Sequence, residues 1–315
     1  MVNIYPFVLL VILNLAGCSF HQTMKTSEAC MQLPSSSEWQ LMASGLEFPE
    51  GPVWTGERLL VSNCYGRRIT EISPAESVSQ IWVAADSSSP WSHTNGLAIG
   101  PDEKLYACEF QHGMIIRFDA VGVSEVVSKG YQKKPFIRPN DLAFDKWGNL
   151  YFTDSGHYRT ENPDGRVYRL AVGSQQVTVV AENLAFPNGL AFSSDYQVVY
   201  VAESARQCIT RFEIAPDGNL LNPTHFAEMP GGDPDGMAFD TDGNLWVAHF
   251  GAGRVMIFSP DGSVLGKIVT PGKKPSNVAF GGTELQTLFL TEDETNCVYQ
   301  IPVPVSGQGL PFTKF

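Results

Sequence analysis

The sequence has 315 residues, of which 43% are hydrophobic and only 17% are charged, and it contains 29 glycines and 21 prolines. This length and composition are typical of a turn-rich β protein with a sizeable core. The formal net charge of −12 opposes contact with phosphate backbones, so nucleic acid is excluded as a partner, whereas bound cations are not.

The amino terminus reads as a targeting segment and is set apart from the fold. Residues Phe7 to Ala16 are apolar apart from Asn14, and the letters LAGC end the segment at Cys18. This pattern resembles the lipobox of a bacterial lipoprotein, and the run is too short to cross a bilayer as a helix of about 20 residues. We therefore predict that residues 1–18 are a lipoprotein-type signal peptide and that Cys18 carries the lipid. The opening letters MVNIYP lack the usual Lys or Arg, so an ordinary secretory signal or an uncleaved anchor is the alternative.

A lipid on Cys18 would anchor the protein in the bacterial cell envelope, facing the periplasm or the exterior, whereas an ordinary signal would make it secreted. The protein is expected to meet the membrane only through this lipid and to be a monomer. Residues 19–38 are polar and rich in serine, and we predict that they form a tether. Five further cysteines, an odd number without a CxxC pair, predict neither a zinc site nor a disulfide.

From Trp39 onward, one phrase recurs six times at intervals of 42 to 48 residues. Each copy has a short apolar run, a cluster of turn residues and an alternating run, as in RPNDLAFDKWGNLYFTD and DPDGMAFDTDGNLWVAHF. Further alternating runs follow, so each unit contains four strands and no helical period. Four-stranded repeats of this length are typical of propeller blades. The sequence predicts an all-β fold, a six-bladed β-propeller with four-stranded blades over residues 39–315.

The two ends of the repeat region are predicted to meet in one blade. Residues Glu38 to Gly51, with the letters EWQLMASGLEFPEG, parallel residues Val177 to Gly189, with the letters VTVVAENLAFPNG. The amino-terminal segment therefore corresponds to the outer strand of a blade that precedes the first phrase. We expect this strand to join the last blade, which would close the ring without an open sheet edge.

One position of the phrase is always polar, and it enters the strand that lines the central channel of a propeller. The six residues are Glu50, Asn95, Asn140, Asn188, Asp235 and Asn277. Backbone crowding explains why a glycine often follows this position, but it does not explain the polar residue itself. Asn and Asp are also common in turns, so a turn role for the polar residue is the alternative. Six such side chains should meet near the axis, where their oxygens suit a hard divalent cation.

These motifs resemble those of the family of senescence marker protein (regucalcin), gluconolactonase and luciferin-regenerating enzyme. The resemblance rests on PEGPVW, RPNDLAF with GNLYFTDSG, PNGLAF, and PDGMAFDTDGNLWVAHF, covers about Trp39 to Ile301, and is closest to the bacterial gluconolactonase branch. It implies a propeller that opens a lactone with one divalent cation in its channel. Calcium is expected first, with zinc, manganese or magnesium as alternatives. Ser155 departs from the branch, which often has proline there.

Carried over motif by motif, the resemblance implies a role for individual residues. The expected cation ligands are Glu50, Asn140, Asn188 and Asp235. Arg138 and Asn140 are expected to contact the small-molecule substrate, and Asp235 is the expected catalytic residue, as the base for water or as the nucleophile. Asn95 and Asn277 share the phrase but not the ligand pattern, so a structural role is expected for both.

The predicted function is that of a divalent-metal-dependent, gluconolactonase-like hydrolase, in which the cation polarises the lactone carbonyl. The sequence has no GxSxG, HExxH or P-loop motif, so a serine hydrolase or a nucleotide enzyme is unsupported. Hydrolysis of an organophosphate or aryl ester at the same site is one alternative. A non-enzymatic binding propeller of the envelope is the other, although such a propeller has no need of four cation-type side chains at one height.

Overall fold

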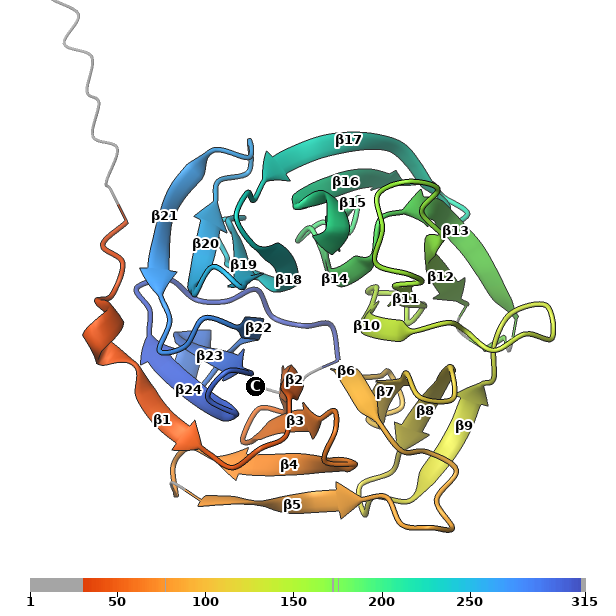
Figure 1. Ribbon diagram of the computed structural model, residues 1–315, viewed down its shortest axis with the longest axis horizontal. Coiled ribbons are helices and arrows are strands. Elements are labelled where there is room, and N and C mark those ends of the chain that lie inside the picture. Colours follow the sequence, from red (N-terminus) through yellow and green to blue (C-terminus); the bar gives the residue numbers. More distant parts are fainter. Residues whose placement is uncertain (1–30, 77, 172, 175, 313–315) are drawn as a thin grey trace, which may run out of the picture. The chain divides into compact units, whose positions relative to one another are not determined.

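The computed structural model describes residues 31–312 except 77, 172 and 175, and from Gln32 onward these residues form one compact unit (Figure 1). The unit is a ring of six four-stranded antiparallel sheets, so the predicted six-bladed propeller is confirmed. Helical structure in the described part is limited to three 3-10 turns: η1 (Ser36–Glu38), η2 (Ser204–Arg206) and η3 (Thr283–Leu285). No helix among these residues has the length and apolar character needed to cross a membrane.

In each blade the first strand lies nearest the axis and the last forms the outer edge (Figure 1). Blade 1 contains β2 (Pro49–Trp54), β3 (Leu59–Asn63), β4 (Arg68–Ser73) and β5 (Val78–Ala84). Blade 2 contains β6 (Thr94–Ile99), β7 (Leu105–Glu109), β8 (Met114–Phe118) and β9 (Ser124–Ser128). Blade 3 contains β10 (Pro139–Phe144), β11 (Leu150–Asp154), β12 (Gly165–Leu170) and β13 (Val177–Leu184).

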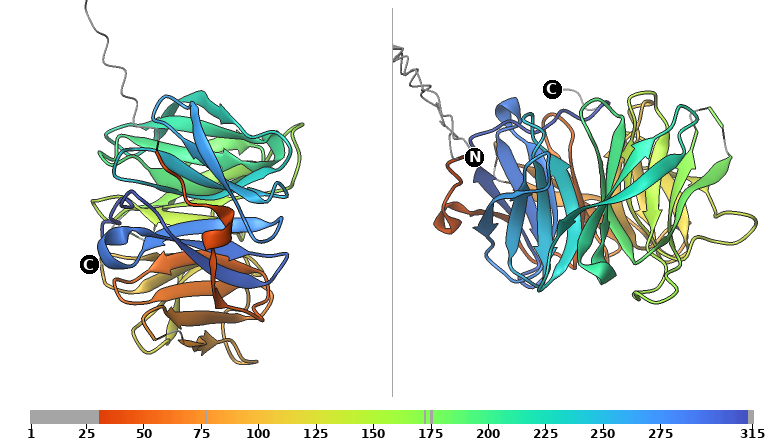
Figure 2. Two further views of the ribbon diagram at one scale, coloured as in Figure 1. Left: turned by 90° about the vertical axis from the view of Figure 1, so that its left-hand side faces the viewer. Right: turned by 90° about the horizontal axis from the view of Figure 1, so that it is seen from above.

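The second half of the ring repeats this order, and in side view the strands run from one face of the ring to the other (Figure 2). Blade 4 contains β14 (Pro187–Phe192), β15 (Val198–Glu203), β16 (Cys208–Ile214) and β17 (Leu220–Glu228). Blade 5 contains β18 (Asp233–Phe239), β19 (Leu245–Phe250), β20 (Arg254–Phe258) and β21 (Val264–Val269). Blade 6 contains β22 (Pro275–Gly281), β23 (Thr287–Glu292), β24 (Cys297–Pro302) and β1 (Gln40–Ala43).

The ring closes as the sequence predicts. Strand β1 pairs antiparallel with β24, and Gln40 lies opposite Gln300. The preceding residues also contact the propeller, because the indole nitrogen of Trp39 donates to the carbonyl oxygen of Val269 at 2.9 Å. The predicted signal peptide with Cys18, and the first part of the predicted tether, lie outside the described residues.

The hydrophobic core is divided into clusters that lie between neighbouring blades. The second strands β3, β7, β11 and β15 are buried along their whole length, whereas the outer strand β5 is mostly exposed. Aromatic rings connect adjacent blades: Trp54 stacks on Phe289 with ring centroids 5.5 Å apart, and Tyr106 meets Phe144 edge-on at 5.0 Å. Each blade therefore depends on its neighbours for burial of its apolar faces.

The turns after the first strands of blades 3 and 5 have the same construction. Asp145 accepts hydrogen bonds from the backbone N–H groups of Trp147 and Asn149, and Asp240 accepts them from Asp242 and Asn244. An aspartate that bonds to the backbone two residues on stabilises a tight turn. The turn clusters DKWGN and DTDGN predicted from the sequence are thereby confirmed.

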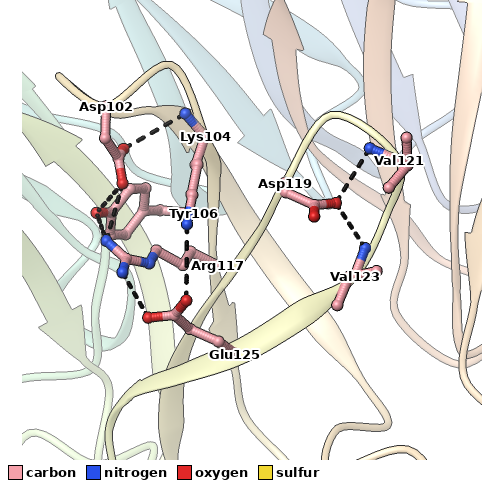
Figure 3. A network of polar contacts seen from close by, with 8 residues as sticks. All are labelled: Asp102, Lys104, Tyr106, Arg117, Asp119, Val121, Val123 and Glu125. Atoms are coloured by element: carbon pink, nitrogen blue, oxygen red, sulfur yellow. Dashed lines mark hydrogen bonds and ion pairs between the residues drawn. The ribbon is translucent and has the colours of Figure 1, made fainter.

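Charged side chains hold the outer part of blade 2 together (Figure 3). Arg117 on β8 donates to Asp102 at 2.8 Å, to the Tyr106 hydroxyl at 3.0 Å and to Glu125 on β9 at 2.5 Å. Asp119 accepts from two backbone N–H groups of the turn between β8 and β9. Because a guanidinium presents several donors in a fixed plane, it can connect three strands at once.

Candidate functional site

Each inner strand is irregular at the repeated polar position. The pairing register shifts between Glu50 and Val53 in blade 1, between Pro187 and Leu190 in blade 4, and between Pro234 and Met237 in blade 5. A β-bulge bends its strand and re-aims a side chain, and such bulges are common beside active sites. The irregularity therefore explains how one residue of an otherwise regular strand reaches the channel.

The glycine after the polar residue is required by close packing at the axis. A Cβ atom on Gly51 would collide with the carbonyl oxygen of Asn95, and one on Gly236 would collide with the side chain of Asn277. Gly51 also has a φ of +51°, which disfavours any side chain. Crowding thus accounts for the glycine and leaves the preceding polar side chain to be explained by what it contacts.

Hydroxyl groups of one blade bond to the inner strand of the next and fix the relative position of the two blades along the channel axis. The Thr153 hydroxyl donates to the backbone oxygen of Asn188 at 2.7 Å, and the Ser204 hydroxyl donates to the backbone oxygen of Pro234 at 2.8 Å. Between the last and first blades, the Ser276 hydroxyl donates to Pro49 at 2.8 Å. These bonds satisfy carbonyl groups near the bulges and align the inner strands.

The five residues named from the sequence line one cavity of about 510 Å³ at one end of the channel. Glu50, Asn188 and Asp235 are buried in it, Asn140 is half-buried, and Arg138 is exposed. Four inner strands, β2, β10, β14 and β18, therefore direct polar side chains into a common space. Their roles as ligands, catalytic group and substrate contacts stay predictions.

Arg138 is positioned through its backbone. The carboxylate of Asp154, at the end of β11, accepts the N–H groups of Ile137 at 3.0 Å and Arg138 at 2.6 Å. The guanidinium itself has no hydrogen bond or ion pair to any other described residue. A fixed backbone with an unpartnered cationic head is suited to contact a ligand in the cavity.

The floor of the cavity contains carboxylates with few donors. Glu50 accepts the Gly51 N–H at 2.9 Å and the side-chain nitrogen of Asn277 at 3.2 Å. Asn188 donates its side-chain nitrogen to the Ser204 hydroxyl at 3.3 Å, and its amide oxygen has no hydrogen bond to another described residue. The Oδ1 atom of Asp235 is buried and has no hydrogen-bond partner among the described residues. A buried carboxylate oxygen without a donor is costly unless something else binds it.

Burial raises the pKa of four acids whose charges act on one another, two of which line the cavity. It raises the pKa of Glu50 to about 7, and burial followed by the charge of Glu50 raises that of Asp235 well above its usual value. Burial and then Glu50 raise the pKa of Asp293 to about 9, and burial raises that of Asp141 to about 6. None of these four carboxylates is in an ion pair with a described Lys, Arg or His.

These residues fit a divalent cation in their chemistry. Crowded, unneutralised carboxylates and a donor-free Oδ1 atom of Asp235 would be stabilised by positive charge, and all the donor atoms are oxygens of the kind that calcium prefers. The described residues contain no cluster of three or more His, Cys, Asp or Glu side chains that could hold a metal. A cation here would therefore depend on two carboxylates, Glu50 and Asp235, with amide oxygens completing the set.

Three residues that interact with the site without lining its cavity were not found from the sequence. Asp141 stands in the third phrase where four other copies have glycine, and this difference could have indicated its role. Asn277 was expected to be structural, and it does contact Glu50 directly. Asp293 follows the last residue of β23, is 8% exposed, and has no hydrogen-bond partner for either carboxylate oxygen among the described residues. Its position after a second strand, which corresponds to Ser155 and Ser204, carried no signal.

Comparisons with known proteins agree with this fold. Residues 48–293 match the model of the SMP-30/Gluconolactonase/LRE-like region. The chain is 32% identical to the gluconolactonase of Zymomonas mobilis over 82% of this chain and 80% of that protein. It is 28% identical to the lactonase drp35 of Staphylococcus haemolyticus over 96% of this chain and 93% of that protein.

A solved structure has the same level of sequence identity to this chain as the Zymomonas mobilis protein. XC5397 from Xanthomonas campestris, described as a gluconolactonase, superposes with a TM-score of 0.74 at 32% identity, and the match covers 84% of this chain and 89% of that one. The resemblance drawn from the sequence motifs is thereby confirmed. The chain belongs to the SMP-30/gluconolactonase/LRE-like family.

Proposed function

We propose that this protein is a hydrolase that opens a lactone, in the manner of a gluconolactonase, at the cavity lined by Glu50, Arg138, Asn140, Asn188 and Asp235. Two similar proteins that match most of the chain carry the names gluconolactonase and lactonase, and they support lactone hydrolysis. The structural observation that carries the proposal is the buried, donor-free Oδ1 atom of Asp235 beside Glu50 in a cavity.

Glu50, Asn140, Asn188 and Asp235 would hold one divalent cation, with calcium expected first. When bound, such a cation would supply Lewis-acid polarisation of the lactone carbonyl. Glu50 is prepared for this role because Gly51 and Asn277 hold its Oε2 atom in place. The amide oxygen of Asn188 has no hydrogen-bond partner among the described residues and would be available to the cation, while its nitrogen bonds to Ser204.

Asp235 would take the proton from the attacking water. The water oxygen forms a bond to the carbonyl carbon, the ring C–O bond breaks, and the ring oxygen receives the proton held by Asp235 and becomes a hydroxyl group, so that the product is a hydroxy acid. A carboxylate oxygen that holds a cation is a weaker base, so this role falls to whichever Asp235 oxygen is not a ligand. Arg138, fixed by Asp154 and unpartnered at its guanidinium, would orient the substrate with Asn140.

The test is the rate of acid release from δ-gluconolactone, an aryl ester and a fluorophosphate. The measurement is made with chelator and after return of calcium, zinc, manganese or magnesium. We expect calcium-dependent hydrolysis of the lactone and a loss of about 10²- to 10⁴-fold in the variant Asp235→Ala. Asp242→Ala is the matched control, because Asp242 is exposed in the turn after β18 and does not line the cavity. Full lactone hydrolysis in chelator, or by Asp235→Ala, would contradict the proposal.

A further inference from the structure

A second acidic residue lines the same cavity nearer to solvent. Asp233 begins β18 two residues before Asp235, and both line the cavity. The bulge of β18 begins after Pro234, so the shared cavity lining, and not regular strand alternation, places both carboxylates in one space. Because Asp235 is buried and Asp233 is half-buried, the strand presents one carboxylate at the floor and another closer to the mouth.

Tyr158 reaches Asp233 from another blade. It stands on the loop between β11 and β12, and its hydroxyl donates to Asp233, with distances of 3.0 Å to both carboxylate oxygens. Its ring meets Phe186, directly before the first strand of the intervening blade, edge-on with ring centroids 5.2 Å apart. The loop is itself held, because Asp164 accepts the His157 N–H at 2.9 Å. The orientation of the Asp233 carboxylate is therefore fixed across the cavity.

The hydrogen-bonding capacity of Asp233 is only partly used. An ionised carboxylate has about four acceptor positions, and Tyr158 and the side chain of Gln207 each supply one hydrogen. Room remains for two more donors on the side of the cavity. A ligand without donors at this place would desolvate the carboxylate without compensation, whereas hydroxyl groups would form charge-assisted bonds to it.

We propose that Asp233, oriented by Tyr158, accepts hydrogen bonds from two neighbouring hydroxyl groups of the substrate, so that the site selects a polyhydroxylated lactone over an alkyl lactone. The inference rests on the proposed lactone hydrolysis and adds a specificity determinant to it. Phe186 and Phe250 line the same cavity and offer apolar surface to the C–H groups of such a ring. With the lactone carbonyl at the level of Asp235, the hydroxyl groups lie toward Asp233.

The test compares kcat/KM for δ-gluconolactone with kcat/KM for δ-valerolactone, which has the same ring and no hydroxyl groups. We expect Asp233→Asn to lower the value for δ-gluconolactone by about 10- to 100-fold, the range for hydrogen bonds to a charged group, and to leave the value for δ-valerolactone within about twofold. Tyr158→Phe is expected to raise KM for δ-gluconolactone by roughly fivefold while kcat is retained. Tyr65→Phe removes a hydroxyl from the same cavity without a contact to Asp233, and should not change the ratio between the two lactones.

An equal loss on both lactones in Asp233→Asn would assign Asp233 a purely structural role and overturn the inference. A wild-type preference for δ-valerolactone would also overturn it, while lactone hydrolysis itself would stand. If neither lactone is hydrolysed, the proposed function fails, and calorimetric titration with 1,5-anhydroglucitol decides about Asp233 separately. Binding that weakens at least tenfold in Asp233→Asn supports the hydroxyl site, whereas equal or absent binding contradicts it.

Discussion

The buried acids of the channel tie the stability of the cation-free protein to pH. The folded-state pKa values of Glu50, Asp141 and Asp293, at about 7, 6 and 9, lie above the values near 4 of an unfolded chain. Between these limits the folded state binds more protons than the unfolded state. The free energy of unfolding therefore falls as the pH rises through this window.

We expect urea unfolding in the presence of chelator to show a lower free energy of unfolding at pH 9 than at pH 5. The proposed calcium ion would bind only the folded state with its carboxylates ionised, so calcium should restore more stability at pH 9 than at pH 5. A series of unfolding curves at both pH values, with and without calcium, measures this. Stability that is constant or rises over this range in chelator would show that the acids are not crowded as described.

Asn277 is expected to affect the calcium affinity of the proposed cation site, although it is not a proposed ligand. Its side-chain nitrogen holds Glu50, so Asn277→Ala is expected to weaken calcium affinity by about 10- to 100-fold, as is typical of groups that orient a ligand. The dependence of the thermal midpoint on calcium concentration reports the affinity. Asn95→Ala is the matched control, since Asn95 holds the same place in its own phrase and is not a proposed ligand. Equal affinities of both variants would rule out the orienting role.

At the scale of the element, close packing at the axis constrains the residues of the inner strand as strongly as the chemistry of the site does. Gly51 and Gly45 both have positive φ, +51° and +72°, but a Cβ atom on Gly45 would meet nothing within 4 Å. Backbone strain alone should make Gly45→Ala cost about 1 kcal/mol. Gly51→Ala adds a collision with Asn95, and we expect at least about 3 kcal/mol. Chemical unfolding of the two variants measures the difference, and equal losses would disprove the crowding.

The sequence predicted the inner strand well because its requirements are local. Several of these requirements appear as the same residues in more than one copy of the phrase. Examples are the Leu-Ala-Phe run, the aspartate turn of Asp145 and the glycine at Gly51. The contact of Tyr158 with Asp233 has no such pattern in the sequence, because the two residues are 75 positions apart and meet only through the curvature of the ring. Asp293 was missed for the same reason, since its importance comes from the neighbouring Glu50 rather than from its own surroundings in the chain.

At the scale of the whole molecule, repetition made the ring and its closure by β1 predictable. The other end of the channel was not predictable, because the segment after β24 has no counterpart in the phrase. The backbone N–H of Gln308 donates to Phe239 at 2.8 Å, and Leu310 and Pro311 line a smaller cavity of about 130 Å³ together with the inner strands. The carboxyl-terminal segment thus covers the end of the channel away from Arg138, so that substrate is expected to enter from the Arg138 side.

Isothermal titration of chelator-treated protein with calcium tests the central claim most directly. The account predicts one calcium ion per chain, and a Kd that rises at least a hundredfold in Glu50→Gln, a variant that keeps the size of the side chain and removes its charge. Hydrolysis of δ-gluconolactone by the same samples should rise with the occupied fraction. Absence of calcium binding, or binding by Glu50→Gln with unchanged affinity, would contradict the claim that these side chains hold a cation in the channel.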